Sequence, residues 1–181
     1  VPVIVFASVW KWIFAGDGSG ILNYFLTQLH IVKAPVSWLT TERGAMTALI
    51  ITNIWRGVPF NMLLLATGLT TLPEELFEAA AIDGANRIQR FCHITLPLLK
   101  PTILSVVTLG FIYTFKAFDL IYIMTNGGPL DSTQILATAS YKLTFSNFEF
   151  GQGAAVANIM LILLLVVAIF NLKLMEKEEV M

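Results

Sequence analysis

Three long apolar segments constrain this chain more than any other feature of its sequence. They cover residues 45–69, 102–124 and 154–172, and few charged side chains interrupt them. A helix needs about 20 apolar residues to cross the hydrocarbon core of a bilayer. Only helices and closed barrels satisfy their own backbone hydrogen bonds in lipid. The sequence therefore predicts an all-α membrane protein, built as a polytopic helical bundle.

The composition agrees with this prediction. Hydrophobic residues make up 56% of the chain and charged residues 13%, whereas soluble proteins carry about 25% charged residues. A fourth apolar stretch, residues 1–14, is too short to span alone and lacks the basic start of a signal peptide. We interpret it as a partial span, and residues 1–181 as a single, N-terminally truncated transmembrane domain.

Several classes of function receive little support. The net charge is −1 and the basic residues are scattered, so we expect no nucleic-acid partner. The single cysteine, Cys92, cannot form an internal disulfide, and His30 and His93 lie far apart in the sequence. No segment matches the phosphate-binding loop that ends in Gly-Lys-Ser/Thr. We expect no catalytic residues, no metal site and no cofactor bound by this chain.

Two loops on one side of the apolar segments carry turn signals. Residues 16–20 predict a flexible turn, and residues 21–31 predict a short amphipathic helix on the membrane surface. Residues 126–129 end the second long apolar segment with strong helix-breaking chemistry. The aromatic-rich stretch 130–152 then predicts a return path along the membrane interface.

The loop at residues 72–100 is unusually charged for a chain of this kind. Thr71 and Glu74 have the spacing of a capping box, which predicts a helix over 72–82. Asp83 and Gly84 should end that helix, and a second short helix is expected over 86–94. The result is a compact elbow with a glycine bend. From these residues alone, a solvated connection between two spans is an equally good interpretation.

Basic residues give a weak prediction of orientation. The loop 72–100 and the C-terminal tail carry slightly more of them than the opposite side does. Because cytoplasmic loops are enriched in Lys and Arg, the charged loop and the C-terminus should be cytoplasmic. The residues compared are Arg87, Arg90, Lys100, Lys173 and Lys177 on one side and Lys11, Lys33, Arg43 and Lys142 on the other.

Ionisable residues inside the apolar segments are the next candidates for function, because such groups are costly in lipid. Arg56 lies near the middle of segment 45–69, and Lys116 and Asp119 lie in segment 102–124. Lys116 and Asp119 are three residues apart, which predicts neighbouring positions on one helix face. A local ion pair would equally well explain Lys116 and Asp119, and a structural contact across the subunit interface would explain Arg56. An ion-coupled secondary transporter using all three residues, or a scaffold subunit without a solute pathway, are alternative functions.

The motif Glu78-Ala79-Ala80, followed by Gly84, Ile94 and Leu96-Pro97, resembles the cytoplasmic signature of the permease subunits of bacterial ATP-binding-cassette importers. Residues 55–62, 118–119, 125–129 and 150–151 resemble more narrowly the carbohydrate-type permeases, such as the maltose and glycerol-phosphate systems. This resemblance implies the type I importer permease fold, with about six spans in the complete family member. It also implies a bacterial inner-membrane protein.

The resemblance further implies that the elbow docks on a cytosolic ATPase. Glu78 would pair with a basic group of the ATPase, Ala79 and Ala80 would allow close packing, and Gly84 would make the bend. The residues that carry this coupling are Glu75, Glu78, Ala79, Ala80, Asp83, Gly84, Ile94, Leu96 and Pro97. ATP and Mg²⁺ would be held by the ATPase dimer, not by this chain.

In the maltose-type relatives, one face of the helix after the loop and the helix before it line the sugar site. The corresponding residues are Arg56, Phe60, Asn61, Gly110, Tyr113, Thr114 and Ala117. Gly110 and Ala117 depart from relatives that have a polar side chain there, and a plain helix-packing seam would look similar. The implied partners are a second permease subunit, an extracytoplasmic binding protein that contacts loops 16–43 and 129–152, and a sugar or polyol-type solute.

Overall fold

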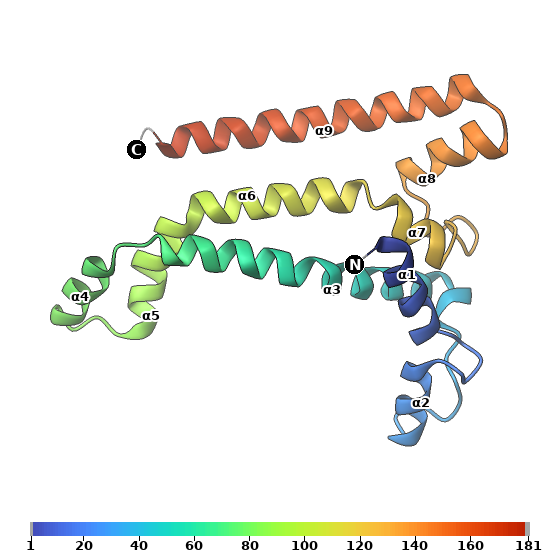
Figure 1. Ribbon diagram of the computed structural model, residues 1–181, viewed down its shortest axis with the longest axis horizontal. Helices are drawn as coiled ribbons and strands as arrows, with labels where there is room; N and C mark the ends of the chain where they lie inside the picture. Colours follow the sequence, from blue (N-terminus) through green and yellow to red (C-terminus); the bar gives the residue numbers. More distant parts are fainter. Residues whose placement is uncertain (1, 180–181) are drawn as a thin grey trace. The chain divides into compact units, whose positions relative to one another are not determined.

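The computed structural model describes the backbone of residues 2–179 and the side chains of residues 2–171 and 173 (Figure 1). All regular elements in this part of the chain are helical. Three helices are long and apolar enough to cross a membrane, at Glu42–Thr70, Arg87–Phe115 and Phe150–Asn171. The elements, in order, are α1 (Val3–Ile13), α2 (Ile21–Gln28), the 3-10 turn η1 (Trp38–Thr40), α3 (Glu42–Thr70), α4 (Glu74–Ile82), α5 (Arg87–Arg90), the π-helical turn η2 (Phe91–Thr95), α6 (Leu96–Phe115), α7 (Phe118–Met124), α8 (Leu136–Tyr141), the π-helical turn η3 (Lys142–Ser146) and α9 (Phe150–Glu179).

The chain forms two compact units. The first unit contains the residues up to Arg56 together with Tyr113–Leu163, and the second contains Gly57–Ile112 together with the residues from Leu164 on. The long helices α3 and α6 each contribute to both units, whereas α1, α2, α7 and α8 belong to the first and α4 and α5 to the second.

The core of the first unit lies where α1, α3 and α7 meet. Small and large apolar side chains from these helices pack together: Ala7, Phe14, Ala48, Leu49, Leu120, Ile121 and Met124. Aromatic rings extend this core, with the ring centroids of Phe14 and Trp38 5.9 Å apart and those of Phe6 and Trp55 5.6 Å apart. α1 is thus held by packing against α7 rather than by its own length of 11 residues.

A buried asparagine fixes the segment between α1 and α3. Asn23 is 1% exposed. Its side-chain nitrogen donates to the carbonyl oxygens of Ala15 and Val36, each at 2.9 Å. Its side-chain oxygen accepts from the Val36 amide at 3.0 Å and from the indole nitrogen of Trp38 at 3.1 Å. All four hydrogen-bonding positions of the amide are therefore satisfied, as a buried polar group requires.

The expected single helix over residues 102–124 is interrupted. α6 ends at Phe115, and α7 begins only at Phe118. Between them Ala117 has a ψ of 54°, outside the helical region, and it is 8% exposed. The break therefore occurs where Ala117 is buried in the core, and no proline or glycine stands at this position in the sequence. The expected surface helix over 21–31 is also shorter than predicted, because α2 ends at Gln28 and His30 has a φ of 55°.

In the second unit, α3 and α6 approach closely at Gly68. A Cβ atom on this residue would lie 2.8 Å from the side chain of Thr102 and 2.9 Å from that of Leu99. Glycine therefore allows the two helices to pack at this level, as small residues do between helices in membranes. This contact lies in the last turn of α3, directly before the elbow, so it fixes the position at which the chain leaves α3.

Two details of the elbow differ from the sequence prediction. The Thr71 hydroxyl does not cap α4; it donates to the carbonyl oxygen of Gly68 at 2.8 Å, and α4 begins at Glu74 with no side-chain cap. The Gly68 carbonyl, in the last turn of α3, also accepts from the Thr71 amide at 3.3 Å, so the hydroxyl adds a second bond to an acceptor close to it in the chain. The second short helix also does not end at Ile94, because the helical path continues through η2 into α6.

Candidate functional site

The elbow is built on a glycine turn between α4 and α5. Gly84 has a φ of +80°, the left-handed conformation that glycine adopts without a steric penalty. The Gly84 amide donates to the Ala81 carbonyl at 3.1 Å, and the Ala85 amide donates to the Ala80 carbonyl at 2.9 Å. This pair of bonds is a Schellman motif, which satisfies the last carbonyls of α4. The predicted glycine bend is present in the structure.

A capping box starts the second arm of the elbow. The Asn86 side chain accepts from the Gln89 amide at 2.9 Å, and the Gln89 side chain accepts from the Asn86 amide at 2.8 Å. Two orphan amides at the start of α5 are therefore satisfied reciprocally. Because the turn and this cap follow each other directly, the chain direction from α4 to α5 is fixed by local hydrogen bonds.

A π-helical turn joins α5 to the membrane-spanning helix. Within η2 the helix widens, and the Leu96 amide donates to the Phe91 carbonyl five residues earlier. Pro97 follows at once. Its ring has no N–H and would clash with the carbonyl of His93 in a regular α-helix, and the wider turn relieves that clash. His93 also contacts the Gln89 carbonyl through Nδ1 at 3.0 Å. The elbow is thereby continuous with α6.

An open groove of about 370 Å³ lies on the inside of the elbow. It brings together four of the predicted coupling residues, Ala80, Asp83, Gly84 and Ile94. Ala85, Gln89, Arg90 and His93 complete the lining. These four were missed, and the sequence gives no signal for them because they reach the groove only after the chain has turned at Gly84. Acidic and basic groups face the groove together, so it can accept hydrogen bonds and donate them.

The remaining predicted coupling residues do not line the groove; three lie on α4 and two lie at the start of α6. Glu75, Glu78, Ala79 and Pro97 are exposed, and Leu96 is 45% exposed. Two bulky apolar residues missed at the sequence level are more exposed still: Ile82 at 87% and Ile88 at 75%. Their position on either side of the glycine bend is the signal that could have found them. An exposed surface of carboxylates and isoleucines is suited to a protein partner.

The predicted pathway residues are found in both units, and each is described within its own. In the first unit, the Asn53 side chain donates to the Thr114 hydroxyl at 3.1 Å, which links α3 to α6. Tyr113 is 57% exposed, and Arg56 is exposed on α3. Ala117 is buried and lies beyond the end of α6. The expected helical stripe therefore loses its last member, because the helix stops at Phe115.

In the second unit, the pathway residues are Phe60, Asn61 and Gly110. Phe60 on α3 is 45% exposed. Asn61 follows directly after Phe60, one turn after Gly57, and its side-chain nitrogen would be 3.7 Å from a Cβ on Gly57. A Cβ on Gly110 would meet nothing within 4 Å. No side chain of this unit therefore packs closely against Gly110.

The predicted pairing of Lys116 and Asp119 on one helix face is wrong. Lys116 lies after the end of α6, and Asp119 lies in the first turn of α7. The break at Ala117 removes the helical phase that would have placed them side by side. Both side chains are exposed, and within residues 2–179 no ion pair joins them.

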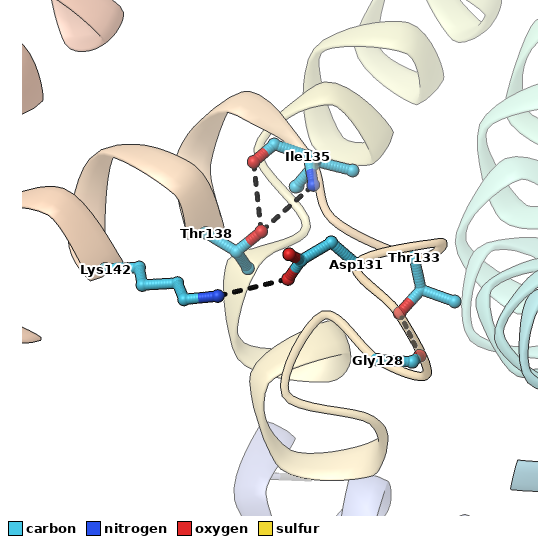
Figure 2. A network of polar contacts seen from close by, with 6 residues as sticks. All are labelled: Gly128, Asp131, Thr133, Ile135, Thr138 and Lys142. Atoms are coloured by element: carbon cyan, nitrogen blue, oxygen red, sulfur yellow. Dashed lines mark hydrogen bonds and ion pairs between the residues drawn. The ribbon is translucent and has the colours of Figure 1, made fainter. Parts of the chain in front are cut away.

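A second ordered loop, between α7 and α8, is held by the polar network in Figure 2. The Thr133 hydroxyl donates to the Gly128 carbonyl at 2.7 Å, and Thr138 bonds to both backbone groups of Ile135. Lys142 forms an ion pair with Asp131 at 3.1 Å. Both partners are more than half exposed, so the pair contributes little to stability. The backbone-directed threonines give this loop its shape.

Comparisons with known proteins agree with these features. The family described as binding-protein-dependent transport system inner membrane component matches residues 1–177. A probable ABC transporter permease of Brucella suis is 37% identical over 179 residues, covering 99% of this chain and 62% of that protein. The trehalose/maltose transport system permease MalF of Thermococcus litoralis is 36% identical over 173 residues, covering 96% of this chain and 57% of that protein. The chain thus spans about three-fifths of the length of these curated relatives.

A solved structure is similar over nearly the whole chain. It is the bacterial alginate ABC transporter in complex with an alginate pentasaccharide-bound periplasmic protein, with a TM-score of 0.83 and 21% identity, covering 94% of this chain and 59% of that chain. At this identity the likeness establishes the fold. The predicted all-α permease fold of type I importers is confirmed, and so is the predicted resemblance to carbohydrate-type permeases.

Proposed function

This chain belongs to the family of binding-protein-dependent transport system inner membrane components, and from that premise we propose that it couples solute import to ATP hydrolysis on a partner subunit. The chain is a membrane protein with several spans in a bacterial inner membrane. Its elbow and C-terminus face the cytoplasm. A second permease subunit completes the pathway, and an extracytoplasmic binding protein delivers the solute to the loops at the other side.

The observation that carries this proposal is the geometry of the elbow. The exposed Glu78 and Ile82 lie on α4, and the exposed Ile88 lies on α5. Local hydrogen bonds fix the turn between these two helices in one shape. The η2 turn then continues this rigid surface into α6. A partner that binds the elbow therefore moves the end of a membrane-spanning helix directly. Rigid elements of this kind convert a local displacement into a change of access across the membrane.

The chemistry of the elbow matches a protein partner with a basic rim and an apolar pocket. Burying Ile82 and Ile88 supplies association energy, and each buried side chain of this size contributes roughly 1.5–3 kcal/mol. Carboxylates such as Glu78 supply orientation through charge-assisted hydrogen bonds. On this proposal the partner is an ATPase dimer, which holds ATP and Mg²⁺ in its own sites.

The solute is proposed to be a sugar or a related polyol. This rests on the similar proteins, which include a trehalose/maltose permease and an alginate importer. In the second unit, Phe60 offers an aromatic face and the adjacent Asn61 offers a hydrogen-bonding amide. Such combinations bind polar ring-shaped ligands. The alternative is an ion-coupled transporter that uses Arg56, Lys116 and Asp119. The helix break at Ala117 takes the last two residues off a common helix face and so favours this alternative less.

The test is whether the ATPase binds through the elbow. The complete permease complex is purified by a tag on the permease, and the bound ATPase is quantified. Glu78→Lys is expected to lower the amount of bound ATPase at least tenfold. Glu149→Lys makes the same charge change in an exposed loop outside the elbow and should leave binding unchanged. Equal binding by both variants, with each protein inserted in the membrane, would reject the assignment.

A further inference from the structure

The outward face of α2 is formed by bulky apolar side chains. Ile21 is 39% exposed, Tyr24 and Phe25 are each 55% exposed, and Leu29, directly after the helix, is 67% exposed. On a helical projection these residues lie on the side away from Asn23. The helix thus turns a polar amide toward the protein and presents its larger apolar residues to the outside. Such a surface needs a covering partner.

The hydrogen bonds of Asn23 determine which way this face points. The side chain bonds to Ala15 before α2 and to Val36 and Trp38 after it. A rotation of α2 about its axis would break all of these contacts at once. The apolar face is therefore held outward by buried bonds on the opposite side, and it cannot turn inward to join the core of the unit.

The direction of α2 favours one kind of partner. In the first unit, α2 runs across the direction of the N-terminal part of α3 rather than alongside it (Figure 1). α3 is long and apolar enough to cross the membrane, so a helix lying across it follows the membrane plane. A neighbouring span parallel to α3 would cross α2 and cover about one turn of it. A layer of lipid headgroups and upper acyl chains runs along its whole length.

The flanking chemistry also suits a lipid surface. Lys33 is exposed shortly after the helix, and a lysine at this level can reach the phosphate groups while its stem stays in apolar surroundings. Tyr24 has an apolar ring and a polar hydroxyl, the combination enriched at membrane interfaces. A binding protein that docks and leaves would expose all of this apolar surface to water between cycles.

We infer that α2 is an interfacial anchor whose face of Ile21, Tyr24, Phe25 and Leu29 inserts into the headgroup and upper acyl region of the bilayer. This role is independent of the ATPase and of the solute. It requires only that α3 spans the membrane. The anchor holds the start of α3 at a fixed depth, through the Asn23 bonds to the segment that precedes it.

The test uses spin labels on the complete permease complex in proteoliposomes. Single cysteines are introduced at Phe25 and, as a second position, at Leu29, with Cys92 replaced by serine. The matched control is a label at Ser19, which is exposed in the turn before α2. Collision rates are measured with oxygen, which concentrates in lipid, and with a nickel chelate, which stays in water.

At Phe25 and Leu29 the oxygen collision rate should exceed the nickel rate several-fold, and at Ser19 the order should reverse. Faster collision with nickel at Phe25 and Leu29 would overturn the inference, because the face would then be in water. Slow collision with both reagents would overturn it as well, because a protein segment would then cover the face. Binding of the ATPase to the elbow is measured separately, so the outcome here leaves that proposal unaffected.

Discussion

Replacing Gly84 tests whether the elbow depends on its backbone conformation. This residue has a φ of +80°, and a Cβ atom placed on it would meet nothing within 4 Å. Within this chain no atom obstructs a methyl group at Gly84, so an effect of Gly84→Ala on the shape of the elbow comes from the backbone conformation. Gly151→Ala is the matched control. Gly151 also has open space around its Cβ position, but it lies in α9 without a positive φ.

The magnitude follows from the left-handed conformation. A residue with a Cβ atom pays roughly 1–2 kcal/mol there. The bent form of the elbow should therefore become about 5 to 30 times less favoured in Gly84→Ala. Asparagine tolerates the same conformation better than alanine, so Gly84→Asn should fall between the wild type and Gly84→Ala. Gly84→Pro should abolish the bend, because proline fixes φ near −65° and removes the amide that bonds to Ala81.

The assay is the affinity of the purified ATPase for the permease complex, followed by solute-stimulated ATP hydrolysis in the assembled transporter. The dissociation constant should rise in the order wild type, Asn, Ala, and stimulated hydrolysis should be absent in the proline variant. Gly151→Ala should behave as the wild type, because alanine is favoured over glycine inside a helix. If Gly84→Ala binds as tightly as the wild type, or Asn is no better than Ala, the conformational argument is wrong.

Two further predictions concern the first unit. Asn23→Leu should lower the free energy of unfolding by at least about 2 kcal/mol, because it leaves several buried polar groups without partners; thermal unfolding in detergent measures this, and an unchanged midpoint would contradict it. Gly153→Ala should destabilise the hairpin between α8 and α9, because the new methyl group would collide with the Thr144 side chain. Combining it with Thr144→Ala should recover part of the loss, and strictly additive losses would show that the two sites do not touch.

Local signals explain what the sequence predicted correctly about the elbow. Asp83 and Gly84 predict a helix end, and the left-handed turn is there because glycine adopts it without steric penalty. The capping role of Thr71 failed for a different reason. Its hydroxyl had two acceptable uses, and the choice between them depended on the end of α3, which the spacing rule does not consider.

Features that depend on packing were beyond the sequence. The break between α6 and α7 has no proline or glycine to announce it, and Ala117 leaves the helix where the chain enters the core. Asn23 looked like one polar residue in an amphipathic stretch. Its partners include Trp38, fifteen residues away. Only the folded loop therefore shows that Asn23 bonds to the segments on both sides of α2. The groove residues Arg90 and His93 likewise face Ala80 only once the elbow has formed.

The π-helical turn at Phe91–Thr95 determines the rotational position of the elbow about the axis of α6. It holds one more residue than an α-helical turn, so it offsets everything before it by about 100° around the axis of α6. Deleting a single residue from this turn would remove the offset and place the elbow on a different side of the span. A loop of ordinary geometry absorbs such a deletion, but this junction cannot. The direction in which Ile88 and the rest of the elbow meet their partner thus depends on how many residues the turn contains, as well as on which residues they are.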